Sequence, residues 1–209
     1  AGQCVPLLEW EKEATREIFG TVREDGTRQY RIVYIEVPKK NGKTTYGAKI
    51  ANFLTYADNE PGAEVYFAAS DRDQAGICYR AAKGAIEQSD LNNYSTVIDS
   101  VKRIVYTATG SFMQVLSADV KKHHGLNVHG AVIDEIHAHP NRDLYDVLTK
   151  GSGAARRQPL YIIITTAGYD RNSICWELHQ KARQIEKGII VDPTFYGKIY
   201  GLEDDEDWE

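Results

Sequence analysis

The order of apolar segments along the chain constrains the fold more than any other feature of the sequence. Runs rich in β-branched and aromatic residues, typical of buried strands, alternate with amphipathic stretches of helical length. Strands are expected at 30–37, 64–69, 130–134, 160–166 and 194–200, helices at 42–56, 72–88, 141–150 and 174–187, and a hairpin at 103–107 and 112–117. Strands that alternate with helices form βαβ units, so we predict an α/β protein with a mostly parallel sheet flanked by helices.

The net charge of −5 is unevenly distributed. Six acidic residues and no basic residue lie in 203–209, and the remaining chain carries 25 basic and 24 acidic residues. A nearly neutral body neither supports nor excludes contact with phosphates. The 209 residues are enough for one α/β domain, which we expect to cover 1–202.

Membrane insertion and disulfide bonding are not expected. No apolar run approaches the roughly 18 residues that a transmembrane helix requires, and residues 1–10 lack the pattern of a signal peptide. Cys4, Cys78 and Cys175 lie far apart and form no CxxC motif. This spacing argues against a disulfide framework or a thiolate zinc site and favours free thiols in a reducing compartment.

A phosphate-binding loop is predicted between the first strand and the first long helix. At such a junction, backbone N–H groups and the positive helix terminus point at one place, which suits a polyphosphate. Lys43 is expected to reach the β- and γ-phosphates, and Thr44 to offer its hydroxyl to Mg²⁺. Val37 stands where the pattern GxxxxGK[ST] has a glycine. The predicted nucleotide-binding residues are Pro38, Lys39, Lys40, Asn41, Gly42, Lys43, Thr44 and Thr45, although Lys39 and Lys40 also fit a role as solvated loop charges.

An acidic pair follows the apolar run Ala131-Val132-Ile133. If this strand neighbours the strand before the phosphate loop, Asp134 can bind Mg²⁺ and Glu135 can polarise the attacking water as a catalytic base. Alone, the pair equally fits an acidic turn after a strand. Together with the phosphate loop it predicts a nucleoside-triphosphate hydrolase. Thr165 and Thr166, at the end of the next apolar strand, are expected to sense the γ-phosphate and to pass strain to the neighbouring segment.

Histidines and arginines near these motifs suggest further roles. His123, His124, His129, His137 and His139 surround Asp134 in the sequence. Their spacing matches no usual zinc pattern, so a histidine-based metal hydrolase is a third hypothesis, and His137 is a candidate to orient the active strand. Among Arg142, Arg156 and Arg157, we expect Arg156 to stabilise charge on the γ-phosphate, in cis or from a neighbouring subunit.

Over nearly its whole length the sequence resembles the large terminases of tailed phages. The similar segments are Trp10 to Gly20, VPKKNGKTT, VYFAASDRDQA, HGLNVHGAVIDEIHAH and GAARRQPLYIIITTAG. The resemblance implies the P-loop NTPase fold and ATP hydrolysis with Mg²⁺ that drives double-stranded DNA into a procapsid. It also implies a ring-forming homo-oligomer on the procapsid that can be monomeric in isolation. The implied partners are the portal and the small terminase subunit, in the host cytoplasm during virion assembly.

The resemblance also implies roles for individual residues. Lys43 and Thr44 belong to the phosphate loop, whose missing first glycine is typical of the family. Asp134 is the Walker B aspartate, Glu135 is catalytic, and Thr165 with Thr166 forms the coupling motif. Trp10 is expected near the adenine. Three features depart from the family: Lys39 replaces a frequent arginine, Glu11 replaces a common glutamine, and 203–209 resembles only the start of a linker to a nuclease domain.

Two alternatives from other classes remain open. Asp134-Glu135-Ile136-His137 also matches the DExH signature of helicases, which need a second RecA-like domain. The domain also fits a nucleotide-gated assembly module that binds ATP without useful turnover.

Overall fold

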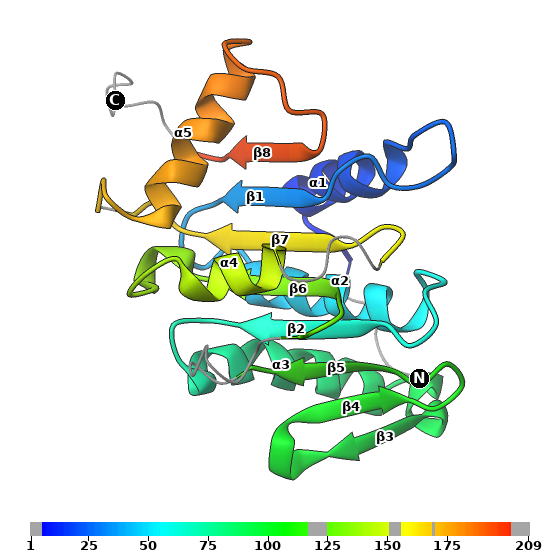
Figure 1. The fold of residues 1–209 in the computed structure, drawn as a ribbon. Helices are drawn as coiled ribbons and strands as arrows, with labels where there is room; N and C mark the ends of the chain where they lie inside the picture. The colour runs from blue at the N-terminus through cyan, green and yellow to red at the C-terminus, as the bar shows by residue number, and fades with distance from the viewer. Residues whose placement is uncertain (1–5, 117–124, 151–155, 169, 202–209) are drawn as a thin grey trace.

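The computed structural model describes residues 6–116, 125–150, 156–168 and 170–201. Within these ranges, eight strands form one sheet in the order β3-β4-β5-β2-β6-β7-β1-β8 (Figure 1). The six strands from β5 to β8 in this order run parallel, and β3 and β4 are antiparallel to their neighbours. The strands are β1 (Ile32–Glu36), β2 (Glu64–Ala68), β3 (Ser95–Ile98), β4 (Arg103–Tyr106), β5 (Ser111–Val115), β6 (Val128–Asp134), β7 (Leu160–Thr165) and β8 (Phe195–Ile199). The predicted α/β class and mostly parallel sheet are therefore confirmed.

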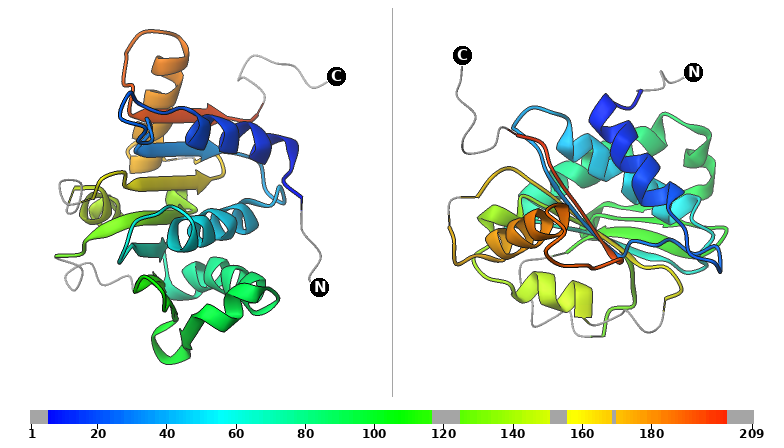
Figure 2. Two further views of the ribbon diagram at one scale, coloured as in Figure 1. Left: turned by 90° about the vertical axis from the view of Figure 1, so that its right-hand side faces the viewer. Right: turned by 90° about the horizontal axis from the view of Figure 1, so that it is seen from above.

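Helices cover both faces of the sheet (Figure 2). One face carries α1 (Glu9–Gly20), α2 (Lys43–Tyr56) and α3 (Arg72–Glu87), and the other carries α4 (Asp143–Lys150) and α5 (Ile174–Glu186). Side chains of a strand alternate between faces, so Val33 and Ile35 of β1 join the core under α2, whereas Tyr34 joins the core under α5. Both cores are apolar, which explains why the sequences of the central strands are continuous runs of hydrophobic residues.

Strand β7 lies between β1 and β6, which the sequence did not reveal. The condition that the Asp134 strand neighbours the strand of the phosphate loop is therefore not met. The register instead pairs Glu36 with Thr165 and Ile164 with Asp134. The carboxyl ends of β1, β7 and β6 consequently meet at one edge of the sheet, with Thr165 between the phosphate loop and the acidic pair.

Most of the expected elements are present with small differences in their bounds. The hairpin forms from β4 and β5, and Asp71 caps α3 by accepting hydrogen bonds from the backbone of Asp73 and Gln74, both at 2.8 Å. Cys78 and Cys175 are buried free thiols, as expected. Cys4 and the acidic segment 203–209 lie outside the described residues. Every helix in the described ranges is too short or too polar to span a bilayer.

Candidate active site

The loop between β1 and α2 is held in a fixed shape by its own residues and by α1. Lys40 and Gly42 both adopt positive φ angles, 67° and 76°. Glycine adopts this conformation freely, whereas a lysine there costs about 1–2 kcal/mol. The indole Nε1 of Trp10 donates to the carbonyl of Asn41 at 3.1 Å, and the amide of Asn41 donates to the carbonyl of Pro38 at 3.2 Å. Trp10 thus contacts the loop from the outside and supports its curvature.

Lys43 begins α2 and points back into this loop. Its side chain is 7% exposed, and Nζ donates to the carbonyls of Val37 and Pro38 at 3.3 and 3.4 Å. Nζ also lies 3.7 Å from Oε1 of Glu135. A cavity of about 320 Å³ opens here, lined by Lys39, Lys40, Gly42, Lys43, Thr44, Thr45 and Glu135. The phosphate loop and Glu135 of the acidic pair, far apart in the sequence, therefore share one cavity.

Asp134 is a buried carboxylate without a hydrogen-bond partner. It is 2% exposed, and neither carboxylate oxygen is hydrogen-bonded to any described residue. Burial and the charge of Glu135 raise its pKa to about 6, against the opposing effect of Lys43. The Thr44 hydroxyl also acts to lower this pKa, but it falls short of hydrogen-bond geometry. The unpartnered Asp134 carboxylate and the nearby Thr44 hydroxyl supply oxygen ligands that suit a hard divalent cation such as Mg²⁺.

Glu135 follows the last residue of β6 in a left-handed conformation, with φ 49° and ψ 51°. Neighbouring side chains of a strand point to opposite faces, so two adjacent carboxylates can share one site only if the strand ends between them. The kink is held by the Glu135 N–H, which donates to the carbonyl of Ile164 at 3.0 Å. Oε1 faces Lys43, and Oε2 accepts hydrogen bonds from the backbone N–H and the hydroxyl of Thr166, both at 3.3 Å.

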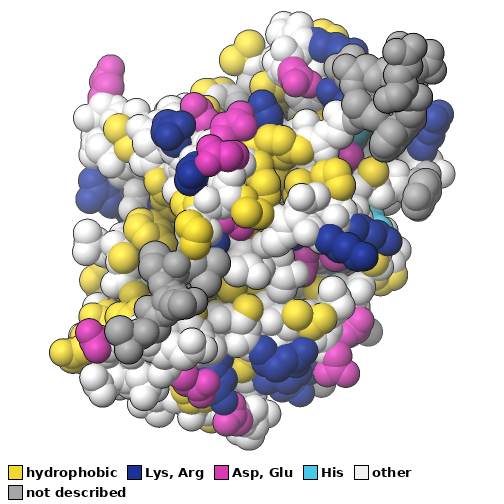
Figure 3. Space-filling model, turned by 180° about the vertical axis from the view of Figure 1, so that it is seen from behind, with side chains coloured by type: hydrophobic (Ala, Val, Ile, Leu, Met, Phe, Trp, Pro, Cys, Tyr) yellow, Lys and Arg dark blue, Asp and Glu magenta, His cyan; other side chains and the backbone are white. Residues whose placement is uncertain are grey.

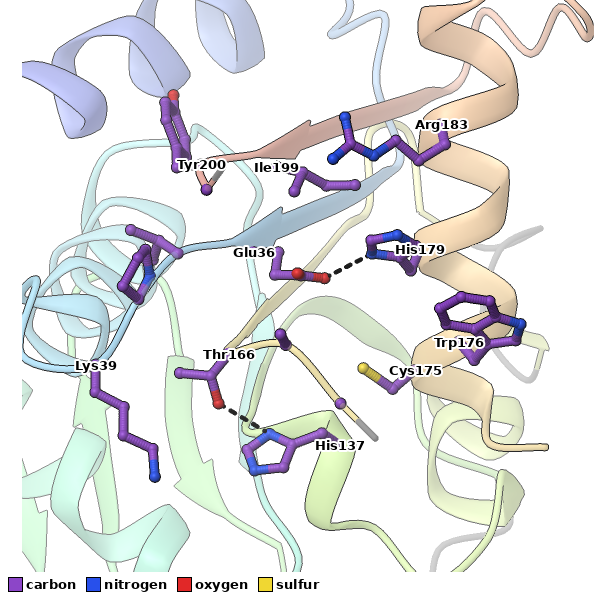
Figure 4. A pocket seen from close by; sticks show the side chains of 15 residues that line it. Glu36, Lys39, His137, Thr166, Cys175, Trp176, His179, Arg183, Ile199 and Tyr200 are labelled. Atoms are coloured by element: carbon purple, nitrogen blue, oxygen red, sulfur yellow. Dashed lines mark hydrogen bonds and ion pairs between the residues drawn. The ribbon is translucent and has the colours of Figure 1, made fainter. Parts of the chain in front are cut away.

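A second cavity, of about 440 Å³, lies beside the first at the carboxyl ends of β1, β7 and β8 (Figure 4). Glu36 and His179 contact each other in its wall, with Oε2 and Nδ1 2.9 Å apart, and the Tyr34 hydroxyl also donates to Glu36 at 2.7 Å. Burial acts to raise the pKa of Glu36, but the hydrogen bonds from His179 and Tyr34 outweigh it, so the pKa lies below its usual value. Lys39 and Thr166 line the wall nearest the phosphate loop. Sequence reasoning missed Glu36 and His179 because they belong to no motif.

Arg156 does not line this site, so the expectation that it acts in cis is wrong, whereas a role in a neighbouring subunit's site stays a prediction. It precedes β7 and therefore lies at the amino edge of the sheet, opposite the phosphate loop. Its guanidinium donates to the carbonyls of Gly62 and Asn127 at 2.7 and 3.1 Å, and it pairs with Glu60 at 3.1 Å. Only 8% of the side chain is exposed. Arg156 thus ties loops together and does not face the phosphate cavity.

The other arginines and the histidines do not gather into a second centre either. Arg142 pairs with Asp146 and Glu177, and Arg157 donates to the carbonyl of Asp25, all through exposed contacts. Three histidines have separate partners: His129 contacts Asp58, His139 the carbonyl of Asp134, and His137 the Thr165 hydroxyl. Within the described ranges, no three His, Cys, Asp or Glu side chains are grouped to hold a metal ion, and His123 and His124 lie outside those ranges.

Charge on the face covered by α1, α2 and α3 is mixed. Basic side chains form separate groups there, with acidic and hydrophobic side chains between them (Figure 3). This agrees with the nearly neutral charge of the chain outside 203–209. Among the described residues, this face therefore carries no continuous basic stripe of the kind that tracks a nucleic-acid backbone.

Comparison with known protein families gives one match over most of the chain. Residues 9–184 match the family described as terminase large subunit, ATPase domain. Protein YmfN of Escherichia coli (strain K12) is 37% identical over 84 residues, which cover 40% of this chain and 18% of YmfN.

Solved structures share the fold. The HK97 bacteriophage large terminase matches 99% of this chain with a TM-score of 0.81 and 22% identity, and the match covers 42% of that terminase. The ATPase domain of the Thermus phage P74-26 large terminase matches 79% of this chain and 72% of its own length, with a TM-score of 0.57 and 17% identity. The large terminase of another thermophilic bacteriophage, solved in complex with ADP, matches 82% of this chain and 40% of its own length, with a TM-score of 0.59 and 11% identity. The chain thus spans less than half of two of these terminases.

Proposed function

Because the chain belongs to the terminase large subunit ATPase family, we propose that it hydrolyses ATP with Mg²⁺ and that this hydrolysis drives double-stranded DNA into a procapsid. The observation that carries the proposal is the shared cavity, in which Lys43 at the start of α2 meets Glu135 after β6, with the buried Asp134 carboxylate close enough to both for their charges to act on its pKa. The ADP complex of the thermophilic phage terminase supports a nucleotide as the ligand.

The chemistry of each side chain follows from its position. Backbone N–H groups of the loop and the start of α2 would bind the phosphates, and the buried Lys43 ammonium would neutralise the β- and γ-phosphates. Thr44 and Asp134 would hold Mg²⁺, which supplies positive charge to the phosphate oxygens when bound. Glu135 would accept a hydrogen bond from water through Oε1. As the water oxygen bonds to the γ-phosphorus and the bond to the β,γ-bridging oxygen breaks, the water's proton passes toward Glu135.

The outer parts of the site have supporting roles in this proposal. Pro38, Lys39, Lys40, Asn41, Gly42 and Thr45 would form the wall around the nucleotide. Trp10 lies beside that wall, packed against Tyr46 with ring centroids 5.0 Å apart, and would support the adenine side. Thr165 and Thr166 would couple the state of the γ-phosphate to the segment that follows β7, because Thr166 already binds Glu135.

The proposal includes a ring of subunits on the procapsid, with the portal and the small terminase subunit as partners in the host cytoplasm. The described residues that line the phosphate cavity include lysines and no arginine. A neighbouring subunit that contributes an additional cation would therefore raise turnover. This predicts that the ATPase rate per subunit rises with protein concentration; a constant rate would argue for a site that is complete in one chain.

Glu135→Gln tests the hydrolytic chemistry against the alternative of a module that binds ATP without turnover. The variant is expected to keep ATP affinity and to lose about a hundredfold or more in kcat, since the amide cannot accept a proton. Glu9→Gln is the matched control because it removes the same charge at a side chain that is 89% exposed. Equal turnover by Glu135→Gln and wild type would refute the assignment. Packaging itself is tested with the same substitution in the full-length terminase and procapsids.

A further inference from the structure

The side chain of His137 lies at the centre of the polar contacts between the acidic pair and β7. It belongs to η4 (Ile136–Ala138), the 3-10 turn that follows Glu135. Its Nδ1 is 3.1 Å from Oε2 of Glu135, 2.9 Å from Oγ1 of Thr165 and 3.4 Å from Oγ1 of Thr166. Figure 4 shows the ring turned toward Thr166. All three contacts use the same ring nitrogen.

The hydrogen-bond pattern determines where the imidazole proton lies. The Thr165 hydroxyl donates its only proton to the carbonyl of Thr166 at 3.1 Å. It must therefore accept from His137, which requires the proton on Nδ1. Nδ1 also lies 3.1 Å from Oε2 of Glu135, within ion-pair distance but without hydrogen-bond geometry. His137 thus donates to the coupling threonine and lies in close polar contact with the catalytic carboxylate.

The two oxygens of Glu135 consequently have different environments. Oε2 accepts hydrogen bonds from the N–H and the hydroxyl of Thr166, and Nδ1 of His137 lies 3.1 Å away. Oε1 faces Lys43 and the phosphate cavity. A carboxylate held at one oxygen has a fixed rotamer, and the other oxygen is then aimed at a fixed point.

Close packing holds the Cβ end of His137 in place. A Cβ atom at Gly168 would lie 3.2 Å from Cβ of His137 and 3.2 Å from Sγ of Cys175. The backbone after the coupling threonines therefore passes tightly between η4 and α5. The base of the His137 side chain is therefore fixed, and its ring lines the cavity of about 440 Å³.

We propose that His137 is a positioning residue for ATP hydrolysis: through Nδ1 it holds Oε2 of Glu135 and Oγ1 of Thr165 together, so that Oε1 of Glu135 faces the attacking water. The inference rests on the proposed function, since it assigns how the catalytic base of that reaction is aimed. His137 would also connect the catalytic Glu135 to Thr165 at the end of β7.

Two substitutions of His137 separate positioning from simple packing. Asparagine carries its amide nitrogen at the place of Nδ1, whereas glutamine carries it one bond farther out, nearer the place of Nε2. Since all three contacts use Nδ1, His137→Asn is expected to retain most of the turnover. His137→Gln and His137→Ala are expected to lose on the order of tenfold to a hundredfold in kcat, as with other outer partners of reacting groups, with KM for ATP within about twofold of wild type. Glu9→Gln, at a side chain that is 89% exposed, is the control and should turn over normally.

A second measurement tests whether His137 acts through Glu135. In the Glu135→Gln background, His137→Ala should cause little further loss, because residues that act as a unit are not additive. The proposal is overturned if Asn and Gln at 137 give equal rates, if the loss appears in KM alone, or if the effect of His137→Ala is undiminished in the Glu135→Gln background. In these cases Glu135→Gln still lowers kcat and the proposed function stands. If Glu135→Gln matches wild type, the proposed function itself has failed.

Discussion

Replacing Asp134 with asparagine is expected to change the pH dependence of stability in the absence of divalent cations. The pKa of Asp134 is raised from 3.8 to about 6 because the carboxylate is buried and lies near Glu135. A carboxyl group that is harder to ionise in the folded state leaves stability intact at low pH and lowers it as pH rises through both values. This difference between the unfolded-state and folded-state pKa corresponds to a total loss of about 3 kcal/mol of unfolding free energy as the pH rises. Roughly 2 kcal/mol of that loss falls between pH 4.5 and 7.5.

Urea unfolding in EDTA at these two pH values measures the effect. Between pH 4.5 and 7.5, Asp134→Asn is expected to gain about 2 kcal/mol of unfolding free energy relative to wild type. The cost of a buried amide is the same at both pH values and cancels. Asp73→Asn is the control, since it removes the same charge from a side chain that is 99% exposed. Millimolar Mg²⁺ should reduce the difference by stabilising only wild type. Equal pH dependence in Asp134→Asn and wild type would refute the reasoning.

Two further predictions test the packing around the site. A Cβ at Gly47 of α2 would lie 2.8 Å from Val132 Cγ1, so Gly47→Ala should lower the unfolding free energy measured in urea by about 1–3 kcal/mol. Gly84→Ala is the control: its Cβ would meet nothing closer than 4.0 Å, so it should be neutral or stabilising by up to about 1 kcal/mol. Equal effects of the two substitutions would contradict tight packing of α2 on β6. Arg156→Ala should lower the unfolding free energy by about 1–3 kcal/mol through lost hydrogen bonds to Glu60 and nearby carbonyls, and should leave kcat per folded molecule unchanged. A loss of kcat without a loss of stability would show that Arg156 acts in catalysis.

Local sequence patterns predicted the elements that have strong local signals. The strand at 160–166 and the helix at 72–88 follow from apolar periodicity and from the capping residue Asp71. Helix α1 lacks the terminal signals, because Leu8 at its N-cap has no side-chain oxygen and its last turn has no basic residue. Edge strand β3 alternates half-buried and exposed residues and lacks an apolar run. Such elements form through tertiary contacts and are hard to read from local sequence.

The candidate site was predictable where a motif fixes both chemistry and position on a strand. Lys43, Asp134 and Glu135 were identified in this way, since loops after parallel strands share one edge. The insertion of β7 between β6 and β1 depends on packing across the whole sheet, and no local pattern encodes it. Arg156 was misplaced because it precedes its strand, and residues that precede a parallel strand lie at the opposite edge.

A crystal structure of the Glu135→Gln variant with ATP and Mg²⁺ tests the central claim most directly. The account predicts the γ-phosphate beside Lys43 Nζ and one Mg²⁺ near the oxygens of Thr44 and Asp134, at distances typical of that ion or through one water. The side chain at 135 should face the γ-phosphate with one end still bound to Thr166. A nucleotide bound elsewhere, or an ion without contact to Asp134, would contradict the claim that these groups form one ATPase site.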